Sequence, residues 1–256
     1  MGMKRREFLK VLLTGFLAPG LGFITPFRPK KYDFYFAQLV YGKGLQWNPR
    51  PGVARSLARI LNQRTSIPSS PERVEIRLNN PQLFFYPFLY FSGEDEFEPF
   101  SEKEIIRLRR WFDAGGFMLV DDALAEPGSG FDQSFQRELK RIFPEAKLTR
   151  LPSDHTVFQS YYLLDKVVGR KAGVPYLSGI NRGDLTVLIY SQNDLGGAID
   201  RSGENFRYPV EPGGEAQREM AIRLFVNIIL YALTANYKKD LIHIPFISER
   251  RKRTLR

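Results

Sequence analysis

The sequence of 256 residues contains no cysteine. This absence excludes disulfide bonds, zinc sites and iron–sulfur clusters with cysteine ligands, a thiolate nucleophile and a lipid anchor on cysteine. Histidine is also scarce, with two residues, and the Gly-x-Ser-x-Gly motif of many serine hydrolases is absent. The strongest catalytic and metal-binding signatures are therefore missing, and function has to be inferred from weaker patterns.

The central part of the chain also lacks a net charge, although the whole chain carries +10. Residues 1–30 hold six basic and one acidic residue, and residues 238–256 hold seven basic and two acidic residues, so each end carries +5. Residues 31–237 therefore carry no net charge. We expect no basic face on this part of the chain that could bind the phosphate backbone of a nucleic acid. The run 250–253 is interpreted as a solvated tail, with contact to anionic lipid or a partner as the alternative.

The N-terminal segment has the layout of a twin-arginine export signal. Residues 4–10 read Lys-Arg-Arg-Glu-Phe-Leu-Lys and stand directly before the apolar run 11–23. This predicts export of a folded protein by the twin-arginine translocation machinery and a periplasmic location. An ordinary secretory signal with a chance arginine pair, or a short membrane anchor, is the alternative.

Cleavage of this leader is only weakly encoded. Signal peptidase prefers small residues in an Ala-x-Ala-like arrangement, and residues 18–23 offer a poor version of it. An uncleaved leader would associate with the inner membrane through residues 8–24. Its apolar stretch is shorter than the ~20 residues that usually span a bilayer, and Pro19 interrupts it.

Residues 31–237 are predicted to form a single α/β domain, preceded by the leader at 1–30 and followed by the basic tail at 238–256. Ser101 and Glu104 form a capping box that opens the clearest helix, and Gly115-Gly116 ends it. Alternating strand-like and helix-like patterns predict a mostly parallel sheet with helices on both faces. Strands are expected at 32–40, 73–78, 84–91, 117–120, 147–151, 174–180 and 185–190. Helices are expected at 53–61, 101–112, 131–143 and 220–232, and a glycine-rich loop at 194–214.

Polar residues follow several of the predicted strands. They are Gly93 to Asp95, Asp121, Asp122, Asp154, His155, Asn193 and Asp194. Because the carboxyl ends of parallel strands share one edge of a sheet, we expect these side chains to converge there and to contact a ligand. Asx turns and helix caps are the structural alternative for each of them.

Chemistry at this edge would depend on Asp122, Asp154 and His155. Together they could ligate a divalent metal or act as acid and base, and no other cofactor is predicted. Ser191 with His155 and Asp194 is a loose candidate for a nucleophilic triad. The Gly-Ser-Gly sequence at 128–130 could hold an anion, with a flexible loop as the alternative.

A second group of ligand-binding candidates lies in the segment from Tyr41 to Arg50. Trp47 and Arg50 are residue types that often anchor interfaces, and Tyr41 and Asn48 accompany them. This composition favours a loop that binds a small molecule or a periplasmic protein. A buried structural loop is the alternative.

Motifs spread over nearly the whole chain after the leader resemble the bacterial "domain of unknown function 4159" (DUF4159) proteins. They lie at 34–39, 41–42, 47–50, 64–66, 87–90, 115–117, 121–122, 143–144, 154–155 and 190–196. More distantly, the Gly-Gly-strand passage, the His155 segment and residues 227–233 are similar to the ThuA-like proteins of the class I glutamine amidotransferase-like fold. These resemblances imply a flavodoxin-like three-layer sandwich.

The family resemblance brings no assigned activity with it. Class I glutamine amidotransferases use a cysteine nucleophile, so the absence of cysteine excludes their glutaminase chemistry here. ThuA-like proteins often carry histidine where Asp121 or Asp122 stands. Two hypotheses follow: a non-catalytic periplasmic module that binds a ligand or partner at the carboxyl edge, which we favour, and a carbohydrate-active hydrolase-like enzyme that uses Asp122, Asp154 and His155.

Overall fold

The computed structural model describes residues 32–234, which belong to one compact unit. The predicted leader and the predicted basic tail lie outside the described residues. Among residues 32–234, no helix is both long and apolar enough to cross a membrane.

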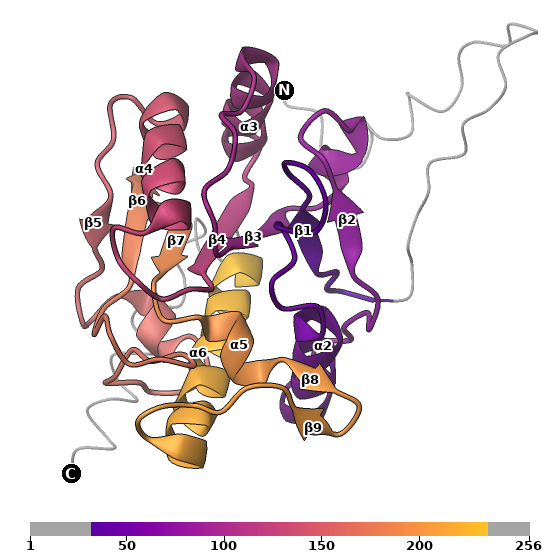
Figure 1. Cartoon of the computed structure of the whole chain (residues 1–256), viewed down its shortest axis with the longest axis vertical. Coiled ribbons are helices and arrows are strands. Elements are labelled where there is room, and N and C mark those ends of the chain that lie inside the picture. Colours follow the sequence, from indigo (N-terminus) through magenta and orange to yellow (C-terminus); the bar gives the residue numbers. More distant parts are fainter. Residues whose placement is uncertain (1–31, 235–256) are drawn as a thin grey trace, which may run out of the picture. The chain divides into compact units, whose positions relative to one another are not determined.

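A seven-stranded sheet forms the centre of the domain (Figure 1). The strand order is β2-β1-β3-β4-β7-β6-β5, and its first four positions match the order of flavodoxin-like sheets. The neighbouring strands β2, β1, β3, β4 and β7 all run parallel to one another. Strand β6 runs antiparallel to both of its neighbours, β7 and β5. The strands are β1 (Ala37–Leu39), β2 (Val74–Ile76), β3 (Phe88–Gly93), β4 (Phe117–Asp122), β5 (Thr149–Arg150), β6 (Ser178–Arg182) and β7 (Leu185–Ser191). The prediction of a mostly parallel α/β sheet is confirmed.

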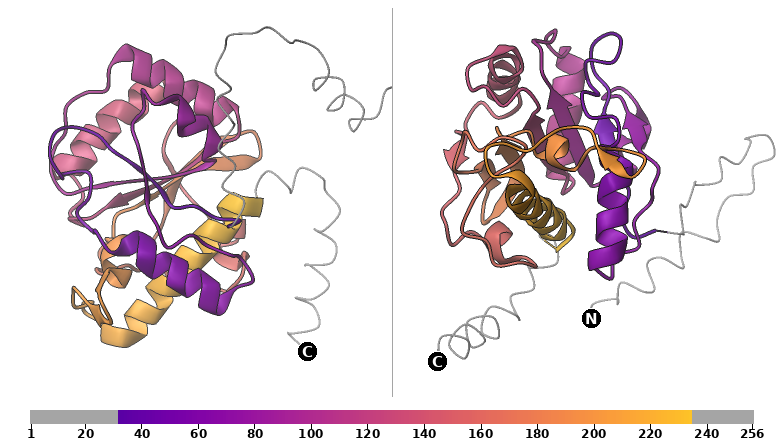
Figure 2. Two further views of the ribbon diagram at one scale, coloured as in Figure 1. Left: turned by 90° about the vertical axis from the view of Figure 1, so that its right-hand side faces the viewer. Right: turned by 60° about the horizontal axis from the view of Figure 1, so that its bottom comes forward.

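Helices cover both faces of the sheet, which gives three layers (Figure 2). One face is covered by α2 (Val53–Arg64), α5 (Leu195–Ile199) and α6 (Gly214–Thr234). The other is covered by α3 (Glu102–Asp113), α4 (Gly130–Ile142) and the short 3-10 helix η1 (Pro81–Phe85). Alternate residues of β3 and β4 therefore enter two separate apolar clusters, as the two-residue period of a strand requires.

The capping box is confirmed. The Ser101 side chain accepts from the Glu104 backbone N–H, and the Glu104 carboxylate accepts from the Ser101 backbone N–H. Gly115 follows this helix with φ of +95°, a conformation that glycine adopts without steric cost. The local signals at both ends of α3 were therefore sufficient to predict it.

Several segments differ from the sequence-based expectation. The strand expected at 32–40 covers only Ala37–Leu39, and the strand expected at 147–151 covers only Thr149–Arg150. The strand expected at 84–91 begins only at Phe88, because Asn80 caps a 3-10 turn that takes up the preceding residues. The strand expected from 174 begins at Ser178. The loop expected at 194–214 contains α5 and a small hairpin of β8 (Arg201–Ser202) and β9 (Asn205–Phe206). A second 3-10 helix, η2, spans Thr156–Gln159.

Candidate functional site

The carboxyl ends of β3, β4 and β7 stand level with one another. Ser92 is the register partner of Asp121, and Asp121 is the register partner of Ser191. The segments after these strands therefore meet, and they bring together Asp121, Asp122 and Asp194. All three residues are fully buried.

Arg50 supplies the positive charge at this edge. Its Nε lies 2.9 and 3.1 Å from the two carboxylate oxygens of Asp194, and its Nη2 lies 2.8 Å from Oδ2. Nη2 also donates to the carbonyl of Ala123 at 2.6 Å. Burial opposes the charge of Arg50, but the hydrogen bonds and the charge of Asp194 hold the pKa of its guanidinium above its ordinary value.

Three further residues complete this ion-pair cluster. Arg170 donates from its Nε to the same Asp194 carboxylate. Arg50 and Arg170 both lie over the ring of Tyr208, at 4.5 and 5.8 Å from its centroid. The remaining nitrogen of Arg50, Nη1, lies 2.8 Å from Oε1 of Glu94, whose side chain is 40% exposed. The cluster thus reaches the surface through Glu94.

Asp194 has a second, structural task. It adopts a left-handed conformation with φ of +53° and accepts from the backbone N–H of Gly197 at 2.9 Å, which caps α5. Aspartate is one of the few residues that tolerate this conformation, because its side chain can bond locally. The carboxylate of Asp194 is therefore occupied by a helix cap and two guanidinium groups.

Asp121 is occupied in a similar way. Its two oxygens accept from the backbone N–H groups of Leu195 and Gly196 at 2.8 and 2.7 Å, and Oδ2 also accepts from the Tyr90 hydroxyl at 2.8 Å. Burial, together with the neighbouring Asp194 charge, raises the pKa of Asp121 to about 7 despite these donors. Both oxygens hold the short helix α5 in place.

Of the three aspartates Asp121, Asp122 and Asp194, only Asp122 keeps an uncommitted carboxylate oxygen. Its Oδ1 accepts from the backbone N–H groups of Leu124 and Ala125, in the manner of an Asx turn. Its Oδ2 is buried and has no hydrogen-bond partner among the described residues. Burial raises the pKa of this carboxyl to about 6. This environment of Asp122 suits proton exchange.

Asn193 has a structural role. Its side chain accepts from the N–H groups of Gly173 and Val174 and donates to the Val174 carbonyl. Its backbone carbonyl accepts from the N–H of Lys171. This fixes the loop that presents Arg170 to the ion-pair cluster.

Side chains of the predicted binding loop, from Tyr41 to Arg50, are engaged in contacts within the domain. Trp47 is 4% exposed and donates to the carbonyl of Gly44. Asn48 accepts from Arg73, whose guanidinium lies 4.8 Å from the Trp47 ring centroid. Tyr41 is buried and donates to the carbonyl of Ser92 at 3.0 Å. The alternative interpretation, a buried structural loop, accounts for these three side chains, and only Arg50 of the four candidates joins the charged cluster.

His155 and Asp154 do not lie at this edge. The His155 ring contacts Thr186 Oγ1 at 2.9 Å and accepts from the N–H of Val157. Thr186 precedes Ser191 by five positions in β7, which places it ~16 Å nearer the amino edge. The expectation that this pair converges with Asp122 is therefore wrong, because the chain folds back after β5 and packs His155 beside Tyr231.

For the same reason, the residues of the candidate metal site and those of the candidate triad do not lie together. Asp122 and Ser191 belong to the carboxyl edge, whereas His155 belongs to the amino half of the sheet. Within residues 32–234, no three His, Cys, Asp or Glu residues gather in a way that could hold a metal ion. The Gly-Ser-Gly sequence lies at the start of a helix, since Gly130 is the first residue of α4, but Gly128 donates its N–H to the Asp132 carboxylate.

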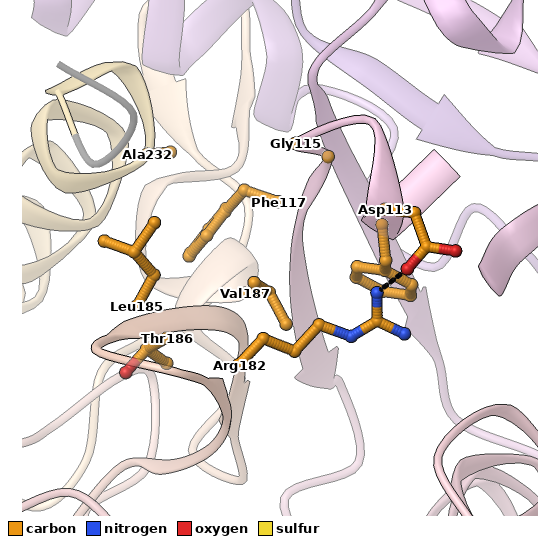
Figure 3. A pocket seen from close by; sticks show the side chains of 10 residues that line it. Asp113, Gly115, Phe117, Arg182, Leu185, Thr186, Val187 and Ala232 are labelled. Atoms are coloured by element: carbon orange, nitrogen blue, oxygen red, sulfur yellow. Dashed lines mark hydrogen bonds and ion pairs between the residues drawn. The ribbon is translucent and has the colours of Figure 1, made fainter. Parts of the chain in front are cut away.

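A depression of about 220 Å³ opens at the amino edge, at the other end of the strands from the charged cluster. Figure 3 shows the side chains that line it. Arg182 and Asp113 form an ion pair at its rim. The lining also includes Phe112, Gly115, Gly116, Phe117, Leu185, Thr186, Val187 and Ala232. It is a shallow surface feature without a cluster of titratable groups.

Arg170 and Tyr208 belong to the charged cluster and were not among the residues that the sequence indicated. Glu94 was among the polar residues expected to converge at this edge. Arg170 and Tyr208 lie in irregular segments that carry no periodic signal, and only the tertiary fold brings them to Asp194.

Comparison with known proteins identifies one family. A family model described as "Domain of unknown function (DUF4159)" matches residues 35–233, well over half of the chain. No curated protein matches the chain.

Proposed function

The chain belongs to the DUF4159 family, and from this premise we propose that its domain is a non-catalytic module that binds a ligand or a protein partner at the carboxyl edge of the sheet. The observation that carries the proposal is the commitment of the charged groups there. Asp121 and Asp194 have all their oxygens engaged in helix capping and ion pairs. Such groups are poor acids, bases or metal ligands, but they hold a binding surface rigid.

The cluster suits an anionic group on the bound molecule. Arg50 Nη1 has one charged partner, Glu94, and that partner is the exposed member of the cluster. A carboxylate or phosphate could take the place of Glu94 and bond to Arg50, with Arg170 and the Tyr208 ring beside it. The exchange of one carboxylate for another costs little electrostatic energy, so Glu94 would act as a competing internal anion.

The test is titration calorimetry of the folded protein with citrate and with inorganic phosphate. E94Q should bind the anion more tightly than the wild type, because the internal competitor is lost. R170Q should bind more weakly by roughly tenfold or more, the value of one charge-assisted hydrogen bond. E204Q is the matched control, since Glu204 also pairs with an arginine, Arg59, but on an exposed surface. Absence of binding to both wild type and E94Q would contradict the proposal.

The alternative, a carbohydrate-active hydrolase, now depends on Asp122 alone. Its raised pKa and its uncommitted Oδ2 favour an acid, but a second carboxylate or a histidine is needed beside it for glycoside hydrolysis. The distant relationship to ThuA-like proteins remains a proposal of the same kind. It rests on the sequence resemblance, and the family model that matches the chain is the one for DUF4159.

Export by the twin-arginine pathway to the periplasm is likewise proposed from the sequence. The Arg5-Arg6 pair and the apolar run after it support it. In a host that has this pathway, R5K/R6K should accumulate in the cytoplasm while the wild type is recovered from the periplasm or inner membrane. Equal export of both would contradict the proposal.

A further inference from the structure

The carboxylate of Asp122 holds the first part of the loop that joins β4 to α4. The N–H groups of Leu124 and Ala125 donate to its Oδ1 at 3.0 and 3.1 Å. Its Oδ2 is buried and has no hydrogen-bond partner within residues 32–234. Leu124 and Ala125 are half-buried, whereas the next two residues, Glu126 and Pro127, are exposed. Asp122 therefore bonds to a surface loop with one oxygen while its other oxygen is kept from water.

Both ends of this loop are fixed. Ala123 is fully buried, donates its N–H to the carbonyl of Gly93 at 3.0 Å and accepts from Nη2 of Arg50 at 2.6 Å. At the other end, Gly128 donates its N–H to the Asp132 carboxylate at 2.7 Å. Gly128 has φ of +84°, a conformation that glycine adopts without steric cost. Residues 124–127 can therefore move between two anchors while the rest of the edge stays in place.

The loop contains a strained residue. Ala125 has φ of +59°, in the left-handed region that residues other than glycine, asparagine and aspartate rarely adopt. Alanine has no polar side chain that could stabilise this conformation by a local hydrogen bond. The bond from the Ala125 N–H to Asp122 holds the residue there. A weaker contact with Asp122 therefore lets Ala125 relax and favours release of the loop.

The groups around Asp122 oppose its ionisation while the loop is bound. Burial raises the pKa of Asp122 to about 6, against the smaller effect of the two N–H donors. The negative charges of Asp132 on α4 and Asp194 after β7 act in the same direction as burial. Tyr190 donates its hydroxyl to Asp132 at 2.9 Å, and burial raises the pKa of this phenol, so it stays neutral. Asp121, the preceding residue, has both oxygens engaged with α5.

We propose that residues 124–127 form a pH-controlled loop, which is bonded to Asp122 while that residue is neutral and is released when it is ionised. Release lets water reach the carboxylate, so the released form has an ordinary pKa of about 4. The bound form is therefore fully favoured below pH of about 4 and loses this advantage as pH rises through about 6. Above that pH the loop presents an ionised Asp122 to solvent beside the Arg50 cluster. The inference goes beyond the proposed binding function and does not depend on it.

Hydrogen exchange measured by NMR on the full chain tests the loop directly. Protection factors, which correct for the intrinsic pH dependence of exchange, are measured for the N–H groups of Leu124 and Ala125 between pH 4 and pH 8. The Ser69 N–H is the internal control, because it donates to the Asn62 side chain, which does not titrate. D122N retains an acceptor but cannot ionise. E126Q is the matched control variant, since it removes an exposed carboxylate from the same loop.

In the wild type and in E126Q, we expect protection of Leu124 and Ala125 to fall on the order of a hundredfold, because the pKa of Asp122 differs by about 2 between the two forms. Protection should stay constant in D122N and at Ser69. Constant protection in the wild type, an equal fall in D122N, or an equal fall at Ser69 overturns the proposal.

A125G provides a second test that leaves Asp122 in place. Glycine adopts the left-handed conformation without strain, so the bound form should be favoured roughly fivefold more than in the wild type. Protection of Leu124 at pH 8 should rise by this factor. Protection equal to that of the wild type overturns the part that Ala125 plays in release.

Discussion

The guanidinium of Arg50 holds the carboxylate of Asp194 across 144 positions of sequence, with three nitrogen–oxygen contacts between 2.8 and 3.1 Å. Arg50 follows β1 and Asp194 follows β7, and β3 and β4 lie between these strands. The pair therefore ties together the segments at opposite sides of the carboxyl edge. The two side chains are 5% and 0% exposed, so water does little to screen them.

R50A should destabilise the domain strongly, because it leaves the buried Asp194 carboxylate with Arg170 as its remaining cationic partner. Removal of one member of a buried ion pair costs about 3–5 kcal/mol. R59A removes an exposed arginine that also pairs with a glutamate, and it should cost less than about 1 kcal/mol. Urea unfolding of both variants measures the difference. Similar losses for the two would show that the buried pair does not hold this edge.

Stability should fall as pH rises from about 4 to about 7. Burial raises the pKa of Asp122 to about 6 and that of Asp121 to about 7, so the folded state binds these protons more tightly than the unfolded state. Their contribution is full below the unfolded pKa of about 4 and is lost as pH passes through the folded values. For Asp122 alone we expect a loss on the order of 3 kcal/mol.

D122N tests this assignment. The asparagine retains an acceptor for the N–H groups of Leu124 and Ala125 and cannot ionise. The stability of D122N, measured by thermal or urea unfolding at each pH, should depend less on pH than that of the wild type. Identical slopes would mean that Asp122 titrates at an ordinary pKa. E98Q, at an exposed position, serves as the control for loss of a carboxylate.

The sequence predicted elements whose signals are local. The capping box at Ser101 and the glycine after α3 act within a few residues, and the apolar spacing of α4 and α6 needs no partner to be recognised. α5 was missed because it is only five residues long and is held by Asp121 and Asp194 rather than by its own sequence. Such a helix exists through tertiary contacts alone.

The position of the candidate site was predicted in part for the same reason. Polar residues that follow parallel strands lie at the same edge of the sheet. This rule of topology correctly predicts that Asp121, Asp122 and Asp194 lie close together. His155 was misplaced because the rule cannot say that the chain folds back after β5. Arg170 was missed because its position depends on Asn193, which anchors its loop through side-chain and backbone bonds.

G93A should destabilise the carboxyl edge by over-packing. A methyl group on Gly93 would lie 2.1 Å from the Tyr41 hydroxyl and 2.5 Å from the Phe131 ring, both of which are buried. Over-packing of this kind costs roughly 1–3 kcal/mol. G173A is the matched control, because its methyl group would meet only Asn193 Oδ1, at 3.9 Å. The free energies of unfolding of the two variants are compared. Equal values would mean that Tyr41 and Phe131 move aside at little cost.

The last prediction concerns Asn227, a buried amide on α6 that makes four hydrogen bonds to one backbone segment. Its Oδ1 accepts from the N–H groups of Tyr161 and Tyr162, and its Nδ2 donates to the carbonyls of Val157 and Tyr162. N227A would leave these buried backbone groups unpaired, at a cost on the order of 3 kcal/mol.

The loss should be local before it is global. Hydrogen exchange at Tyr161 and Tyr162 should accelerate in N227A more than exchange in β4, because these two N–H groups lose their acceptor directly. N227D keeps the acceptor oxygens but not the donor, so its exchange at these positions should stay closer to that of the wild type. N62A is the control, since Asn62 makes a comparable pair of bonds to Ser69 from an exposed position. Uniform acceleration over the whole domain would show that Asn227 supports the core in general, and not the segment that contains Tyr161 and Tyr162 in particular.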